Sequence, residues 1–154
     1  MPSSAVSTPV FSIITPTAGK RPIALGQAIE SVTKALSTYV ALYPDQGDPV
    51  EMLIGYDGLK GPRLSDASFL RYYDFRKTGD FGNAIRDALI KVAKGRYILF
   101  LDDDNSLLPD AFIAFAKAFP SEFIVGRIDV SRAFDVPAIP RPDEEQSIRQ
   151  GDID

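Results

Sequence analysis

The chain has 154 residues, enough for one domain with a buried core, and its 45% hydrophobic and 25% charged content is ordinary for a globular protein. Its 17 basic and 21 acidic residues give a net charge of −4, and no basic cluster with interleaved aromatic residues occurs, so nucleic acid is not expected as a partner. The sequence has no cysteine and no histidine, which excludes disulfides, thiolate or imidazole metal sites and Ser-His-Asp catalysis.

The two ends of the chain lack the patterns of folded elements. Residues 1–9 have neither the basic nor the apolar region of a secretory signal, and we expect them to be flexible. Residues 134–154 combine several prolines with acidic residues, and we expect an extended or mobile acidic tail. No apolar run approaches the roughly 20 residues of a membrane span. The sequence therefore predicts a cytoplasmic protein with one domain at residues 10–133 and no integral membrane segment.

Between these ends the hydrophobic pattern alternates between strands and helices. An apolar run at residues 10–15 ends at Pro16 and predicts the first strand. Apolar residues recur every three or four positions from 23 to 42 and predict a helix, and residues 50–55 predict the second strand. A strand, a helix and a strand form a right-handed unit with parallel strands. Further strands are predicted at residues 69–75, 96–101 and 123–130, and further helices at 81–93 and 109–119. The fold class is therefore α/β with a mainly parallel sheet.

Three carboxylates, Asp102, Asp103 and Asp104, follow the apolar strand at 96–101 directly, and we call them the acidic triplet. Carboxylate oxygens at the carboxyl end of a parallel strand favour Mg²⁺ or Mn²⁺, usually shared with a phosphate. A solvated acidic turn before the next helix is the alternative interpretation.

Other polar residues follow strands in the same way. Thr15 and Pro16 end the first predicted strand, Asp57 follows the second, and Arg76 follows the third. Parallel strands bring these ends to one edge of the sheet, where open α/β sheets bind ligands. Acidic side chains, an arginine and a metal ion can together hold a nucleoside diphosphate.

Five blocks of the chain carry a resemblance to a known family: residues 10–17, 51–58, 82–89, 93–105 and 108–112. They resemble the inverting glycosyltransferases of family 2 in their first strand with a Pro-Thr turn, their second strand ending near Asp-Asp-Gly, and their DXD metal motif. The resemblance covers about residues 10–130. It implies a GT-A fold, a Rossmann-like three-layer α/β/α sandwich, and transfer of a sugar from a UDP- or GDP-linked donor to the hydroxyl of a glycan, lipid or protein.

The resemblance also implies roles for single residues. Asp104, with Asp102, would hold Mn²⁺ or Mg²⁺, and Asp102 or Asp103 would reach the ribose or the water shell of the metal. Asp57 would contact the nucleotide base, and Arg76 stands where some members use an arginine on the base. The backbone around Thr15 and Pro16 would line the nucleoside pocket. No catalytic residue is identified.

The chain departs from the family pattern at several positions. Tyr56 replaces the usual first Asp of Asp-Asp-Gly, and it would either stack on the base or pack at the end of its strand. Asp87 replaces an Asn that usually follows the helix arginine, here Arg86, which we interpret as an ordinary helix-surface charge rather than a positioning residue.

The chain is also short after the acidic triplet, where family members supply the acceptor site and the catalytic carboxylate. A non-catalytic or truncated nucleotide-sugar-binding domain is therefore the main alternative. A haloacid dehalogenase-type phosphatase is a weaker one, because Asp102-x-Asp104 also resembles the first motif of those enzymes.

Overall fold

The computed structural model describes residues 8–58 and 60–126. The chain divides after Ile113 into two compact units, and the sheet and its helices belong to the first. The predicted tail at 134–154 and most of the predicted flexible N-terminus lie outside the described residues. In the part that is described, no helix is long and apolar enough to cross a membrane.

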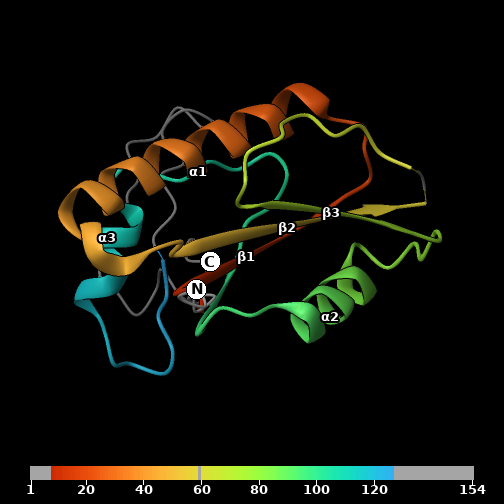
Figure 1. Cartoon of the computed structure of the whole chain (residues 1–154). Coiled ribbons are helices and arrows are strands. Elements are labelled where there is room, and N and C mark those ends of the chain that lie inside the picture. The colour runs from red at the N-terminus through yellow and green to blue at the C-terminus, as the bar shows by residue number, and fades with distance from the viewer. Residues whose placement is uncertain (1–7, 59, 127–154) are drawn as a thin grey trace, which may run out of the picture. The chain divides into compact units, whose positions relative to one another are not determined.

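The first unit is built on a four-stranded sheet in which every pairing is parallel (Figure 1). Its strands lie in the order β3-β2-β1-β4. The central strands β1 and β2 are buried along almost their whole length, which explains why their sequences are apolar runs without alternation. The strand bounds are β1 (Phe11–Thr17), β2 (Val50–Asp57), β3 (Leu70–Phe75) and β4 (Tyr97–Phe100).

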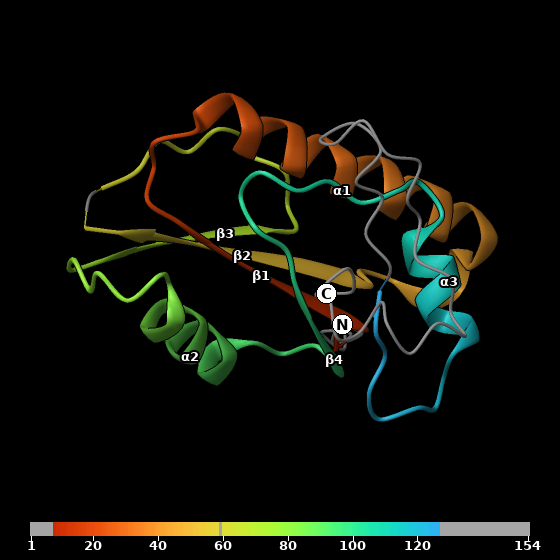
Figure 2. The ribbon, with the colours of Figure 1, turned by 180° about the vertical axis from the view of Figure 1, so that it is seen from behind.

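Helices cover both faces of this sheet (Figures 1 and 2). Helix α1 (Pro22–Leu42) lies on one face and starts with a proline, whose fixed φ suits the first helical position. Helix α2 (Asn83–Val92) lies on the other face and buries Ile85 and Leu89. The predicted three-layer α/β fold is therefore confirmed. A short 3-10 helix, η1 (Pro44–Gln46), follows α1, and the last helix of the described residues is α3 (Ala111–Lys117).

Glycine lets α2 approach the sheet closely. A Cβ atom at Gly55 of β2 would lie 2.4 Å from Cγ2 of Ile85, so no larger residue fits without moving the helix. The buried cluster under α2 contains Ile14, Leu53, Ile85 and Leu89. The position of α2 matters for the site because this helix also carries Arg86.

A buried carboxylate, Glu51, links neighbouring strands by hydrogen bonds near their amino ends, at the edge of the sheet away from the acidic triplet. Glu51 accepts hydrogen bonds of 2.6 Å from the Ser12 hydroxyl and from the Lys94 backbone N–H. The Ser12 hydroxyl in turn accepts a 2.7 Å bond from the N–H of Gly95. These bonds join β1, β2 and the turn before β4, which fixes where β4 starts.

Three predicted elements differ from the observed ones. The helix predicted from residue 81 starts at Asn83, because Phe81 (φ 60°) and Gly82 (φ 85°) have left-handed backbone. The helix predicted at 109–119 is confined to Ala111–Lys117. The strand predicted at 123–130 is wrong for residues 123–126, which form no ladder with a described strand, and residues 127–130 lie outside the described residues.

Candidate functional site

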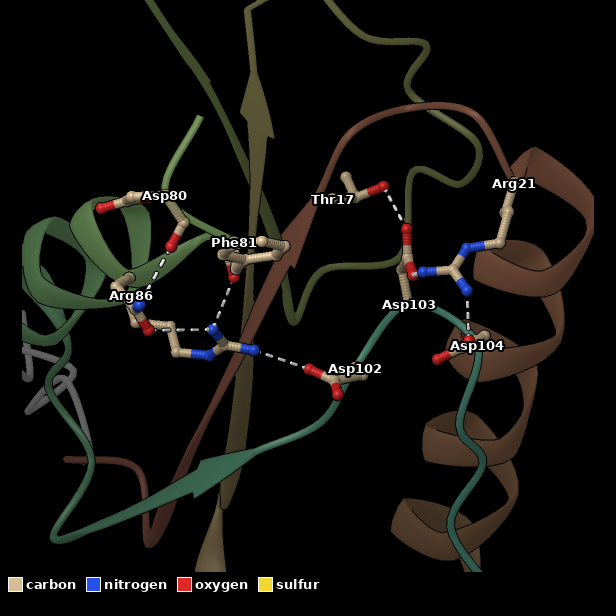
Figure 3. A network of polar contacts seen from close by, with 9 residues as sticks. Thr17, Arg21, Asp80, Phe81, Arg86, Asp102, Asp103 and Asp104 are labelled. Carbon is tan, nitrogen blue, oxygen red and sulfur yellow. Dashed lines mark hydrogen bonds and ion pairs between the residues drawn. The ribbon is translucent and has the colours of Figure 1, made fainter. Parts of the chain in front are cut away.

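Parallel topology brings the predicted polar residues to the carboxyl edge of the sheet. Thr15 and Pro16 lie near the end of β1, which continues to Thr17. Asp57 is the last residue of β2, Arg76 follows β3, and the acidic triplet follows β4. Figure 3 shows the acidic triplet between two arginines that come from the loop after β1 and from α2.

Each carboxylate of the acidic triplet is paired with an arginine. Asp102 accepts a 2.8 Å hydrogen bond from Nη2 of Arg86, and Asp103 accepts one of 2.6 Å from Nη2 of Arg21. The other terminal nitrogen of Arg21 donates to Asp104. Asp103 also accepts a 2.5 Å bond from the hydroxyl of Thr17 and is only 4% exposed, whereas Asp104 is exposed. The acidic triplet is therefore an ordered, charge-paired cluster and not a freely solvated turn.

Arg86 connects two loops of the site. Besides Asp102, its guanidinium donates a 3.0 Å hydrogen bond to the backbone carbonyl of Phe81, and its side chain is only 26% exposed (Figure 3). The interpretation of Arg86 as an ordinary surface charge is therefore wrong. It holds the loop before α2 against the loop after β4.

Asp57 is held by the loop that follows β3. It accepts hydrogen bonds from the backbone N–H of Thr78 (2.7 Å) and from the Thr78 hydroxyl (3.1 Å), and it pairs with Nζ of Lys77 at 3.2 Å. The backbone bond from Thr78 is the main reason that the pKa of Asp57 lies below its usual value, with Lys77 adding to it. Asp57 is thus charged and fixed at the edge of the sheet.

The remaining predicted site residues differ in accessibility. Arg76 is exposed and, among the described residues, makes no side-chain hydrogen bond or ion pair. Pro16 is half-buried beside Gly82, where a Cβ atom would lie 2.9 Å from the Pro16 ring. Thr15 is fully buried, and its hydroxyl has no partner among the described residues. The predicted roles of all three in nucleotide binding remain predictions.

Tyr56 packs at the end of its strand. Its side chain is fully buried under Gly61, and its hydroxyl donates a 2.6 Å hydrogen bond to the carbonyl of Pro62. No face of the ring is open to a nucleotide base. The packing interpretation of Tyr56 is therefore confirmed over the stacking one.

Sequence reasoning missed the contacts that Thr17, Arg21 and Phe81 make with the acidic triplet and with Arg86. Thr17 and Arg21 meet Asp103 across more than eighty positions of sequence, and no local pattern indicates such a contact. Phe81 is 96% exposed and has a positive φ, which is rare for an aromatic residue and frequent at functional sites. The glycines that flank this loop are the signal that could have indicated it.

Arginine side chains occupy carboxylate oxygens of the acidic triplet that a divalent cation would otherwise use. These oxygen atoms are of the kind that Mg²⁺ and Mn²⁺ prefer. However, the guanidinium of Arg21 bridges the carboxylates of Asp103 and Asp104. Across residues 8–58 and 60–126, no three His, Cys, Asp or Glu side chains gather as metal ligands.

Comparisons with known proteins inform the fold. No family model and no curated protein matches the chain. Among solved structures, the chain is similar to TarS 1–349 of S. aureus, a glycosyltransferase, with 19% sequence identity and a TM-score of 0.53. The match covers 70% of this chain and 31% of that one, so the chain spans less than a third of the TarS structure. The likeness concerns the fold: both chains share an α/β architecture, in agreement with a Rossmann-like GT-A core.

Proposed function

We propose that the chain binds a nucleoside-diphosphate sugar at the carboxyl edge of its sheet and transfers the sugar to an acceptor hydroxyl. The observation that carries this proposal is the cluster of Arg21, Arg86 and the acidic triplet at the edge where α/β sheets bind nucleotides. The glycosyltransferase-like fold supports the same class of reaction.

The charged groups suit the parts of such a donor. Guanidinium groups bind phosphate oxygens through charge-assisted hydrogen bonds, so Arg86 would face the diphosphate. The fixed carboxylate of Asp57 can accept a hydrogen bond from a base, and Arg76 is free to approach a base carbonyl. Transfer with inversion requires a carboxylate to deprotonate the acceptor as it attacks the anomeric carbon from the face opposite the diphosphate. Binding of Mn²⁺ or Mg²⁺ by Asp104 and Asp102 stays a prediction.

A non-catalytic or partial nucleotide-sugar-binding domain is the second candidate. It is favoured by the coverage of the TarS structure, because the match takes in 31% of that chain and leaves the rest unmatched. This candidate predicts nucleotide binding without turnover.

Calorimetric titration with UDP and with GDP, with and without Mn²⁺, tests donor binding. We expect one nucleotide to bind and Arg86→Ala to weaken it at least about tenfold, or 1.4 kcal/mol, because the variant removes a charged donor. Lys91→Ala is the matched control: it removes a charge from the same helix, where, among the described residues, Lys91 pairs with exposed Asp87. Absence of binding by both nucleotides at millimolar concentration refutes the proposal. Binding without hydrolysis or transfer from UDP- or GDP-sugars favours the non-catalytic domain.

A further inference from the structure

One guanidinium satisfies two neighbouring carboxylates of the acidic triplet. Nη2 of Arg21 donates to Oδ1 of Asp103 at 2.6 Å, and Nη1 donates to Oδ2 of Asp104 (Figure 3). The arginine therefore uses carboxylate oxygens that a bound cation would otherwise use. It comes from the loop after β1, whereas the carboxylates come from the loop after β4.

Asp103 needs a positive partner. Its side chain is 5% exposed, and a buried carboxylate without a counterion is strongly destabilising. The Thr17 hydroxyl donates a short bond but carries no charge. Among the described residues, Arg21 is the cation that pairs with Asp103, and it does so from a side chain that is itself 55% exposed.

The position of Arg21 in its helix gives no other reason for an arginine there. Arg21 is the N-cap residue of α1, and it makes no side-chain cap hydrogen bond. Ser, Thr, Asp and Asn are preferred at this position, and a positive charge at a helix N-terminus is unfavourable because of the helix dipole. Two ion pairs with the acidic triplet offset that cost. Because its side chain is half in solvent, Arg21 can leave the pair without unpacking the core.

We propose that Arg21 is a built-in counterion that takes the place of a divalent cation at Asp103 and Asp104. The chain then holds these two carboxylates neutralised without a metal, and a metal ion binds them only by displacing Arg21. This inference rests on the proposed function only in treating the acidic triplet as the donor end of the site.

Titration with Mn²⁺ alone, in the absence of any nucleotide, tests this competition. The whole chain and its variants are titrated by calorimetry, and their melting temperatures are measured with and without Mn²⁺. We expect Arg21→Gln to bind Mn²⁺ at least about tenfold more tightly than the unchanged chain and to gain more thermal stability from it. The Mn²⁺ affinity of Arg21→Lys should lie between those of the unchanged chain and of Arg21→Gln, because an ammonium cannot bridge two carboxylates as a planar guanidinium does.

Lys20→Ala is the matched control. Lys20 carries the same charge and is the neighbour of Arg21 in sequence, but its side chain has no carboxylate partner among the described residues. The variant should bind Mn²⁺ as the unchanged chain does. Adding Asp104→Asn to Arg21→Gln should remove the gained affinity. If Arg21→Gln folds only with Mn²⁺ present, the proposal is supported equally, because the metal then replaces the lost counterion. Equal Mn²⁺ affinity of the unchanged chain and of Arg21→Gln overturns it. Because no nucleotide is present, that result leaves the donor proposal standing.

Discussion

Replacing Gly55 by alanine should push α2 away from the sheet. The new Cβ atom would lie 2.4 Å from Cγ2 of Ile85, 3.1 Å from Cε2 of Phe75 and 3.2 Å from Cδ1 of Leu89. Ordinary carbon contacts are about 3.5–4.0 Å, so the closest approach is short by roughly 1 Å or more. All three neighbours pack in or against the buried cluster under α2 and have little room to turn.

Overpacking of this kind costs about 1–3 kcal/mol, and the severity of the overlap places Gly55→Ala near the upper end of that range. A loss of about 2–3 kcal/mol lowers the melting temperature of a chain of this size by roughly 5–10 °C. Urea unfolding followed by circular dichroism measures the free energy, and calorimetry measures the melting temperature. Gly26→Ala is the control: Gly26 lies inside α1 with nothing within 4 Å of its added Cβ, so that change should stabilise by about 0.5–1 kcal/mol.

A second variant identifies the atom responsible. Ile85→Leu removes the Cγ2 methyl that meets the new Cβ but keeps the size of the side chain, and alone it should cost under about 1.5 kcal/mol. In the double variant with Gly55→Ala, the loss should be smaller than the sum of the two single losses, by at least about 0.5 kcal/mol. The reasoning fails if Gly55→Ala is as stable as the unchanged chain, or if the two losses simply add.

Three further predictions concern stability. Thr15→Val should raise the free energy of unfolding by about 1 kcal/mol in urea melts, since it removes a buried hydroxyl without a described partner; a loss would indicate that the hydroxyl is bonded. In Asp74→Asn, the melting temperature should decrease less between about pH 4 and pH 2 than it does in the unchanged chain. Two hydrogen bonds from Arg63 lower the pKa of Asp74 from 3.8 to about 2, so its stabilisation is present above pH 3.8 and is lost as the pH falls through 2; an unchanged acid profile contradicts this. Gly61→Ala should cost roughly 2–3 kcal/mol of unfolding free energy, because its Cβ would lie 2.2 Å from the buried ring of Tyr56, and full stability of that variant would show that the loop yields freely.

The layers of the fold are predictable from the sequence because they follow from local patterns. The apolar runs of β1 and β2 and the three-to-four-residue spacing in α1 indicate buried strands and an amphipathic helix without reference to distant residues. Parallel order then places Asp57 and the acidic triplet at one edge of the sheet. These expectations need only the direction of each strand.

The contacts inside the site follow from tertiary structure and have no local signature. The partner of Asp103 is Arg21, which lies 82 positions earlier in the chain, and the burial of Tyr56 depends on how the loop through Gly61 folds back over it. The late start of α2 depends on the left-handed backbone of Phe81, a residue type that does not favour that conformation. Charge and spacing alone therefore indicated an acidic site but not the arginines that neutralise it.

The order of strands in the sheet has a consequence for synthesis of the chain. β1 lies at the centre of the sheet, yet it is made first, and its two neighbours begin only at Val50 and Tyr97. At about 5–20 residues per second, roughly ten seconds of translation separate β1 from β4. During that interval β1 leaves the ribosome as an apolar strand with at least one edge unpaired. A nascent chain in this state is a target for chaperones and for wrong pairing with its neighbours on the same polysome.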